Sequence, residues 1–289
     1  MANAREIQLR IRSIKGTQQI TRAMKLVSTA KLQKIRGIAE EGRPYFSMVY
    51  QTVCSILQTS TEDVSAMAGF SQPAGAENAP MAYILITSDR GLAGGYNVNV
   101  CRQLEGVIED RENALIITIG KRGREYFERR GYRVDAHYDN AEEVPQMAEV
   151  NRIARYVMGL YNEGTVSGVQ IAFTAFKNTL SQIPTVMRLF PLNPEDFQTE
   201  GTELVSMNYE PGPEEVMKRI MPLYISGILH GAMAEASASE QGARMTAMDS
   251  ATDNAGDMID TLTLQYNRAR QGHITQELTE IINGAAALE

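Results

Sequence analysis

Tryptophan is missing from this chain of 289 residues, and aromatic residues together make up only 7% of it. Methionine is plentiful at 15, which favours long helices packed by flexible aliphatic side chains over a β-sandwich. The two cysteines, Cys54 and Cys101, form no CxxC pair and are too few for a disulfide framework, so we expect buried or half-buried thiols in a reducing compartment. The three histidines lie far apart without metal-ligand spacing, and we therefore expect no metal site.

Long hydrophobic runs are also lacking. No stretch approaches the ~18 apolar residues that a membrane span needs, so we do not expect the chain to cross a bilayer. No apolar segment follows the first residues, and we expect no signal peptide. The hydrophobic content of 43% and the charged content of 22% are ordinary for a globular protein with one large or two small domains.

Acidic residues are absent between Ile7 and Ala39, a stretch that holds eight lysines and arginines, although the net charge of the chain is −7. A basic rod on an acidic body suggests an electrostatic partner for the rod. The residues alone leave four interpretations open: a solvated face, a nucleic-acid or membrane surface, a mitochondrial presequence, or a rod inside an acidic sleeve. Interleaved aromatics are missing until Tyr45 and Phe46, and no cleavage-like break interrupts the pattern. The rod in a sleeve fits the rest of the chain best.

Residues 1–58 are predicted to form one long helix, beginning near residue 4. A second stripe of Ile20, Met24 and Val27 is offset around the helix from its main seam, so more than one face is expected to be occupied. Pro44 marks an expected kink or weak point. Residues 59–80, rich in Ser, Thr, Ala, Gly and Pro, are typical of a linker. The main seam follows steps of three and four through Ile7, Ile11, Ile14, Thr21, Ser28, Leu32 and Ile35.

In residues 81–210, short apolar runs such as MAYILIT and ALIITIG alternate with amphipathic helical stretches. This alternation predicts a central α/β domain with a mostly parallel sheet, whose final two strands could form an antiparallel pair.

Residues 211–289 predict a second long helix, with Pro213 in its first turn and acidic residues at the positive end of the helix dipole. Pro222 should kink or break it. About sixty further residues would span roughly 90 Å, too long to be buried in the chain's own core, so the N-terminal helix is the expected partner. The predicted fold class is α/β, with a long antiparallel coiled coil of the terminal helices protruding from the central domain. Its second seam would comprise Ala243, Ala247, Ala251, Ala255, Ile259, Leu262, Tyr266 and Ala269.

Residues able to carry catalysis are not evident. The sequence GLAGG follows a strand but matches neither the P-loop nor G-x-G-x-x-G, and Gly-rich turns at such places are common for geometric reasons alone. Ser88 and Asp89 have no histidine nearby to complete a triad. We therefore expect no catalytic residue and no cofactor.

Three motifs resemble one protein family. GTQQITRAMKLVSTAKLQKIR near the start, SDRGLAGGYN after the first strand and YNRARQGHITQELTEIINGAAAL at the end are similar to the γ subunit of F-type ATP synthase, in order and over essentially the whole chain. The resemblance departs at Ala93, where the family often has Cys. It implies a central rotary shaft: a coiled coil inside a ring of α and β subunits, with a globular domain resting on the ε subunit and the membrane c-ring. Proton flow would turn the shaft, which would transmit torque and carry no catalytic group itself.

The resemblance also assigns contact residues. The C-terminal end of the chain would enter an apolar collar of the ring, where uncharged side chains suit a sliding surface. Met24 is equally well explained by seam packing. The basic rod would turn past an acidic segment of each β subunit. The assigned contacts are Met24, Arg244, Arg270, Gln271, Ile274 and Glu277 toward the ring, Tyr209 and Glu210 toward the c-ring and ε, and Arg12, Lys31, Lys34 and Arg36 as the electrostatic face.

Two alternative functions remain open: an α/β nucleotide-binding enzyme with helical arms, and a basic coiled coil that binds nucleic acid. The resemblance favours neither, because it implies no nucleic-acid partner and membrane association only through the complex. It implies a peripheral location at the cytoplasmic face of a bacterial cell membrane. Neither cysteine corresponds to the thiol switch of chloroplast γ subunits.

Overall fold

The computed structural model describes residues 4–59, 69–73, 75–140, 144–197 and 209–286. The chain folds into two compact units, one formed by Met1–Ser28 with Arg244–Glu289 and the other by Thr29–Ala243. The borders of these units fall inside the two long terminal helices, because the inner half of each helix packs against the sheet.

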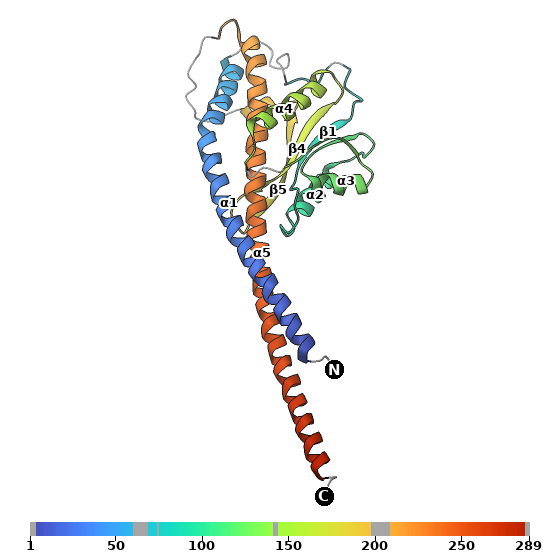
Figure 1. The fold of residues 1–289 in the computed structure, drawn as a ribbon. Coiled ribbons are helices and arrows are strands. Elements are labelled where there is room, and N and C mark those ends of the chain that lie inside the picture. Colours follow the sequence, from blue (N-terminus) through green and yellow to red (C-terminus); the bar gives the residue numbers. More distant parts are fainter. Residues whose placement is uncertain (1–3, 60–68, 74, 141–143, 198–208, 287–289) are drawn as a thin grey trace. The chain divides into compact units, whose positions relative to one another are not determined.

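The terminal helices are α1, Ala4–Thr59, and α5, Pro213–Ala286 (Figure 1). Their extents agree closely with the sequence prediction, including the start of α5 at Pro213. Pro222 was expected to kink or break the helix, and the break does not occur, since α5 continues through it; α1 likewise continues through Pro44. Burial explains the tolerance at Pro222: Met217, Met221 and Ile225 are all 2% exposed or less, and this burial offsets the ~3 kcal/mol that an internal proline costs.

The Thr29–Ala243 unit contains a five-stranded sheet in the order β3-β2-β1-β4-β5. The first four strands pair in parallel and β5 pairs antiparallel with β4, as the sequence predicted. Mostly apolar runs form the central strands, because a parallel sheet is covered on both faces. The strands are β1 Met81–Ile86, β2 Ala114–Ile119, β3 Arg133–Tyr138, β4 Gly168–Phe176 and β5 Gln182–Phe190; the helices between them are α2 Tyr96–Val107, α3 Lys121–Arg129 and α4 Met147–Asn162, and η2 Pro194–Phe197 follows β5.

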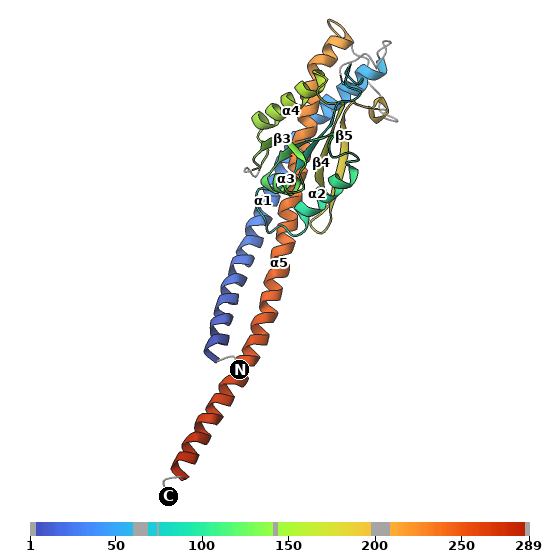
Figure 2. The same cartoon turned by 90° about the vertical axis from the view of Figure 1, so that its right-hand side faces the viewer.

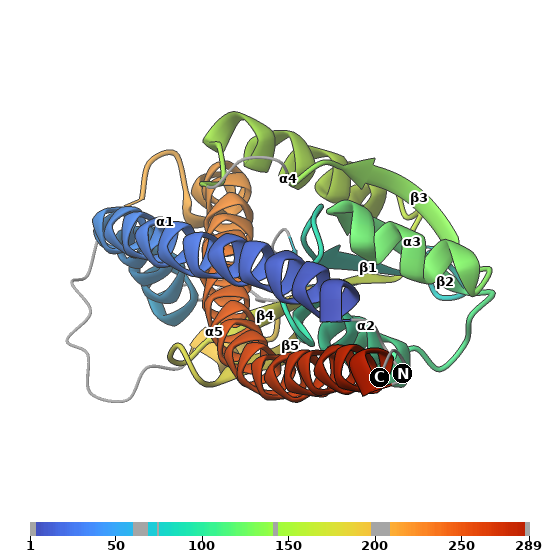
Figure 3. The ribbon, with the colours of Figure 1, turned by 60° about the horizontal axis from the view of Figure 1, so that its bottom comes forward.

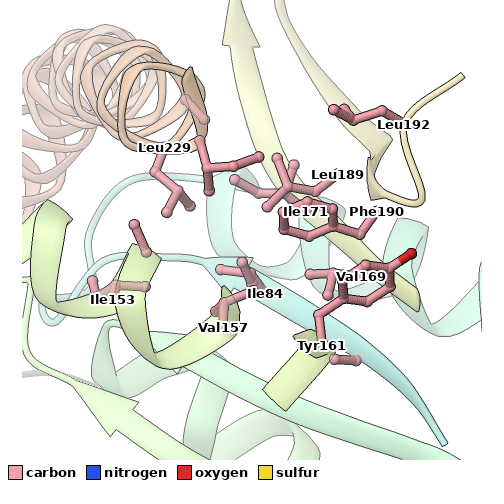
Figure 4. Packing of buried hydrophobic residues seen from close by; sticks show 14 of the residues in the cluster. Ile84, Ile153, Val157, Tyr161, Val169, Ile171, Leu189, Phe190, Leu192 and Leu229 are labelled. Atoms are coloured by element: carbon pink, nitrogen blue, oxygen red, sulfur yellow. The ribbon is translucent and has the colours of Figure 1, made fainter. Parts of the chain in front are cut away.

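Helices cover both faces of this sheet. On one face, α4 and the inner halves of α1 and α5 bury the larger core, where Leu229 of α5 lies among residues of α4, β1, β4 and β5 (Figure 4). In the same core the ring of Tyr161 stacks on that of Phe190 with centroids 4.6 Å apart. On the other face, α2 and α3 enclose a smaller core around Leu104 and Phe127. Helix α2 lies beside β4 and β5 (Figure 3).

Residues 69–73 and 75–80 pack in this unit. Phe70 is 8% exposed and its ring lies 5.7 Å from that of Phe197. The Leu192 amide donates to the carbonyl of Gly69 at 2.8 Å. Residues 60–68 and 74 of the expected linker lie outside the described residues.

In the other unit, α1 and α5 run antiparallel, and α5 continues past the start of α1 (Figures 1 and 2). The main seam is confirmed at Ile7, Thr21 and Ser28, and the second seam at Ala255, each no more than 8% exposed. The second stripe is different: Ile20 and Val27 are 62% and 54% exposed, so this chain's described residues leave that face of α1 open. The remaining predicted seam positions in this unit, Ile11, Ile14, Ala247, Ala251, Ile259, Leu262, Tyr266 and Ala269, are half-buried.

Candidate functional site

The loop between β1 and α2 stands where a doubly wound sheet binds nucleotides, at the carboxyl ends of the strands where the strand order reverses. Side chains of this loop bond to one another there. The Ser88 amide donates to Asn97 Oδ1 at 2.9 Å, and Asn97 Nδ2 donates to Ser88 Oγ at 2.8 Å. Asp89 accepts from the Lys121 amide at 2.9 Å, placing a carboxylate at the start of α3.

Gly120, directly after β2, packs against the end of β1 at the same edge of the sheet. Its φ is +98°, and a Cβ atom there would lie 2.2 Å from the carbonyl oxygen of Thr87. Only glycine fits both the backbone angle and the close approach of the ends of β1 and β2. Among the described residues, no group of three or more His, Cys, Asp or Glu is placed to hold a metal ion.

A polar layer crosses the coiled-coil seam. Thr21 and Thr252 share a hydrogen bond between their hydroxyl oxygens at 2.7 Å, and Gln18 Nε2 donates to the Thr252 carbonyl at 3.3 Å. One turn further along, Lys25 Nζ lies 2.5 Å from Asp249 Oδ1. Polar groups that satisfy one another only in one alignment fix the register of paired helices.

Beyond this layer, α1 and α5 leave a groove of about 420 Å³ between them. Ile14, Met258 and Leu262 provide most of its apolar lining, and Arg10 and Asp257 border it. Arg10 also pairs with Glu6 at 2.9 Å. The seam is therefore less tightly packed here than at Thr21.

The last part of α5 is the most exposed region of the described chain. Every residue from Gln271 to Asn283 is exposed. Ile274, Leu278 and Ile281 follow helical steps of four and three, and their exposed fractions are 47%, 55% and 68%. A regular stripe of large apolar side chains without cover in the chain itself is typical of a surface that binds a partner.

The structure resembles solved central-stalk chains. A chain of the rotor of the Euglena gracilis mitochondrial ATP synthase aligns with a TM-score of 0.68 at 18% identity, covering 94% of this chain and 98% of that one. A chain of the Tetrahymena thermophila central stalk and c-ring aligns with a TM-score of 0.59 at 23% identity over 80% of this chain and 99% of that one. At these identities the likeness concerns the fold.

Sequence comparison decides the family. The ATP synthase family model matches residues 3–288. The ATP synthase γ chain of Lachnoclostridium phytofermentans is 44% identical over 298 residues, covering 100% of both chains. The sodium ion specific γ chain of Acetobacterium woodii is 43% identical over 303 residues, covering 99% of each. The chain belongs to the ATP synthase γ family. The resemblance found in the three sequence motifs is thereby confirmed.

The contact residues that the resemblance assigns near the C-terminus lie together on α5. Arg270, Ile274 and Glu277 are spaced by four and three residues along α5, and Gln271 stands beside Arg270, so all four are exposed on neighbouring parts of one helix surface. Glu277 Oε1 is 3.2 Å from His273 Nδ1. Because these residues are exposed, another protein chain can contact them.

Two other residues that the resemblance assigns as ring contacts are buried to different extents. Arg244 is only 8% exposed, so little of its side chain is available to another subunit, and no sequence pattern indicated this burial. Met24 is half-buried on α1, consistent with seam packing as well as with a contact.

The basic-face residues divide between the two units. Arg12 belongs to one unit and Lys31, Lys34 and Arg36 to the other. Lys31 and Lys34 are three residues apart and therefore neighbours on the helix surface, while Arg12 and Arg36 are exposed.

Tyr209 and Glu210, which the resemblance assigns to the contact with the c-ring and ε, lie just before α5. The Tyr209 hydroxyl donates to Ser55 Oγ at 2.8 Å, which ties this segment to α1, and Glu210 is exposed. One side chain therefore anchors the segment and its neighbour faces outward.

Proposed function

We propose that this chain is the central rotor shaft of an ATP synthase. Its coiled coil turns inside a ring of α and β subunits, and its α/β unit meets the ε subunit and the c-ring. The observation that carries the proposal is the exposed stripe of α5, Ile274, Leu278 and Ile281, which needs a surrounding partner and stands in a chain of the γ family.

Torque transmission requires the two helices to behave as one body. The polar layer of Gln18, Thr21 and Thr252 together with the Lys25–Asp249 pair supports this, because a slip of one helix along the other would break these bonds together. Registry, rather than the energy of any single exposed pair, is the contribution that matters here.

The chain is proposed to be non-catalytic within a catalytic complex. Support comes from the loop at Ser88 and Asn97, where the position for a nucleotide is taken by side chains bonded to each other. The site of ATP chemistry then lies in the ring, and the shaft acts on it by changing which ring subunit it presses against. The nucleotide-binding and nucleic-acid-binding alternatives have no feature in the described residues that favours them over this role.

The ion that drives the complex is proposed to be the proton, and the chain is proposed to be peripheral at the cytoplasmic face of a bacterial membrane. No helix in the described ranges is both long and apolar enough to span a membrane. The similar γ chain of Acetobacterium woodii is sodium ion specific, so sodium is the competing ion to test. ATP-driven transport measured with the purified complex in vesicles, with and without sodium, distinguishes the two ions.

Single-molecule rotation tests the shaft role. The ring is fixed to a surface and a bead is attached to a cysteine introduced at exposed Glu112 in the α/β unit. Addition of Mg-ATP should turn the bead in one direction. A matched sample without the chain should hydrolyse ATP without coupled ion transport. Normal coupled transport in the absence of this chain would sink the proposal.

A further inference from the structure

The end of α5 extends beyond the start of α1 as a single helix (Figure 2). Ala269 is the last half-buried residue in the described part of α5, and every side chain from Arg270 to Asn283 is exposed. A lone helix of this length is only marginally stable in water, and a glycine inside it, Gly272, lowers its stability further. A stable helix here therefore needs another surface to pack against.

The exposed side chains of this region form a seam with steps of three and four residues, which is the spacing with which one helix packs along another. Four of its six members are large and apolar, and each of these four is at least 47% exposed. We call the six residues the free seam: Leu264, Asn267, Gln271, Ile274, Leu278 and Ile281.

The free seam lies on a different face of α5 from the one that contacts α1. Leu262 and Tyr266 are half-buried in the coiled coil, whereas Leu264, midway between them in the chain, is 62% exposed. Two residues correspond to about 200° of rotation around an α-helix, so Leu264 points away from α1. A further helix can therefore pack on the free seam while α1 stays in place.

Charged residues beside the free seam favour a second copy of the chain as its partner. Arg270 and Glu277 are seven residues apart, and each directly precedes a seam residue, so both lie on one flank of the seam. When the seam of a second copy packs in the opposite direction, this flank faces itself, and Arg270 of each copy lies beside Glu277 of the other. Glu277 is also 3.2 Å from His273 of its own helix, and a carboxylate can accept from both groups.

The opposite flank agrees with the antiparallel direction. It carries Arg268 and Thr275, which would face each other without a clash of like charges. In a parallel pair, Arg270 would instead face Thr275 of the other copy and form no ion pair. Only the antiparallel arrangement provides two symmetric ion pairs.

We propose that the free seam binds a second copy of this chain as an antiparallel, two-fold pair before the chain enters its complex. The inference goes beyond the rotor function, because it concerns the unassembled chain. Asn267 and Gln271 place polar groups in the seam, and polar residues at such positions lower the stability of a coiled coil. The pair is therefore weak: it covers the apolar end of α5 in concentrated solution and leaves a dilute chain monomeric. Because the proposed ring needs the same side chains, assembly displaces the second copy.

Sedimentation of the full chain tests the pairing. The average mass should rise with concentration from one copy toward two and no further, since a two-fold contact uses the seams of both copies. Arg270→Glu should weaken the association by about tenfold or more, because two ion pairs are lost and two repulsions replace them. Glu277→Arg should do the same, and the variant with both changes should associate like the parent. Arg268→Glu on the other flank is the matched control and should change little.

Two sedimentation results contradict the pairing. A chain that is monomeric at every concentration has no such contact, and the proposal fails. Single charge reversals that associate as strongly as the parent, or a double reversal that does not restore the association, show that Arg270 and Glu277 do not meet, and this overturns the proposal as well.

Cysteine cross-linking tests the direction of the pair. In the antiparallel pair, Leu264 of one copy lies opposite Ile281 of the other. Cys54 and Cys101 are buried, so introduced thiols are the reactive ones. On oxidation, a mixture of Leu264→Cys and Ile281→Cys chains should form a disulfide-linked pair several-fold faster than either variant alone. Equal or faster linking within a single variant would show a parallel or unspecific contact and overturn the proposal.

Assembly shows whether the ring and the second copy use the same surface. The linked pair of Leu264→Cys and Ile281→Cys chains should not assemble with α and β subunits until dithiothreitol releases it. A linked pair that enters the complex overturns the proposal. Failure of the unsubstituted chain to assemble counts against the rotor function alone, because the sedimentation and cross-linking results are obtained without the ring.

Discussion

Thr21 of α1 and Thr252 of α5 face each other across the coiled-coil seam, with their hydroxyl oxygens 2.7 Å apart. Thr21 is 8% exposed, and its hydroxyl also lies 3.1 Å from the Gln18 carbonyl. The two threonines thus join a polar layer to positions that otherwise carry small or apolar residues. Their bond exists in only one alignment of the helices.

Removing one of these hydroxyls should weaken the layer. We expect Thr252→Val to lower the free energy of unfolding by about 1 kcal/mol, because Thr21 keeps a buried hydroxyl that has lost a partner. Thr21→Val with Thr252→Val should cost less than the sum of the two single changes. Urea unfolding of the full chain measures the cycle, with Thr263→Val on the exposed part of α5 as control. Strict additivity would show that the bond does not couple the helices.

The long helices and the sheet could be predicted from the sequence because each follows a strong local pattern. The runs MAYILI and ALIITI became β1 and β2, and Pro213 marked the start of α5. The break expected at Pro222 does not occur because local propensity is outweighed by the burial of Met217 and Met221 in a core assembled from distant segments. Tertiary packing, not local sequence, decided that position.

The candidate surfaces were only partly predictable for the same reason. The exposed positions on α5, such as Ile274, follow from a helix that outruns its partner. The burial of Arg244 depends on which elements come together, and periodicity does not report that. The second stripe of α1 had the right pattern, but no described part of the chain covers Ile20.

Acid should destabilise the α/β unit through His230. Its side chain is packed 5.3 Å from the Phe46 ring, and burial lowers the pKa of His230 below its usual value. The unfolded chain therefore binds the proton first, and stability is lost as the pH falls through the ordinary range of histidine, near ~6.5, toward the lower folded pKa.

The variant His230→Gln should reduce that pH dependence. Burial raises the pKa of Glu235, which acts in the opposite direction at lower pH, so the informative quantity is the difference between variant and unsubstituted chain. Unfolding free energies at a series of pH values give this difference, with His273→Gln on exposed α5 as control. Parallel pH curves for the His230 variant and the parent would contradict the assignment.

Thiol reagents should have little effect on this chain. Cys54 and Cys101 are free and buried, and burial raises the pKa of the Cys101 thiol to about 12. The reactive thiolate is therefore scarce at neutral pH. We expect the activity of the complex to be the same with and without dithiothreitol. A several-fold change would show a thiol switch.

The basic face should act collectively. Replacing Arg12, Lys31, Lys34 and Arg36 together by Gln should weaken assembly or coupling progressively, because each exposed ion pair contributes only ~0.2–1 kcal/mol. The defect should grow at raised salt, where the remaining pairs are screened. ATP-driven ion transport at several salt concentrations measures it. Normal coupling of the fourfold variant at every salt concentration would identify the basic face as solvated surface.

Variants of the exposed stripe of α5 distinguish an effect on contacts with other subunits from an effect on folding. Ile274, Leu278 and Ile281 are each 47% exposed or more, so their removal should barely change the stability of the isolated chain. The triple change to Ala keeps a small, uncharged surface, and we expect it to assemble and couple with a modest loss. The triple change to Glu places charges where, in the proposed function, an apolar collar of the ring closes around the helix, and burying an unpaired carboxylate is costly. We expect that variant to assemble poorly although its unfolding curve matches the parent. Thermal unfolding of the isolated chain and coupled transport of the complex are measured side by side, and equal coupling of the Ala and Glu variants would mean that this part of α5 turns in solvent and touches no ring.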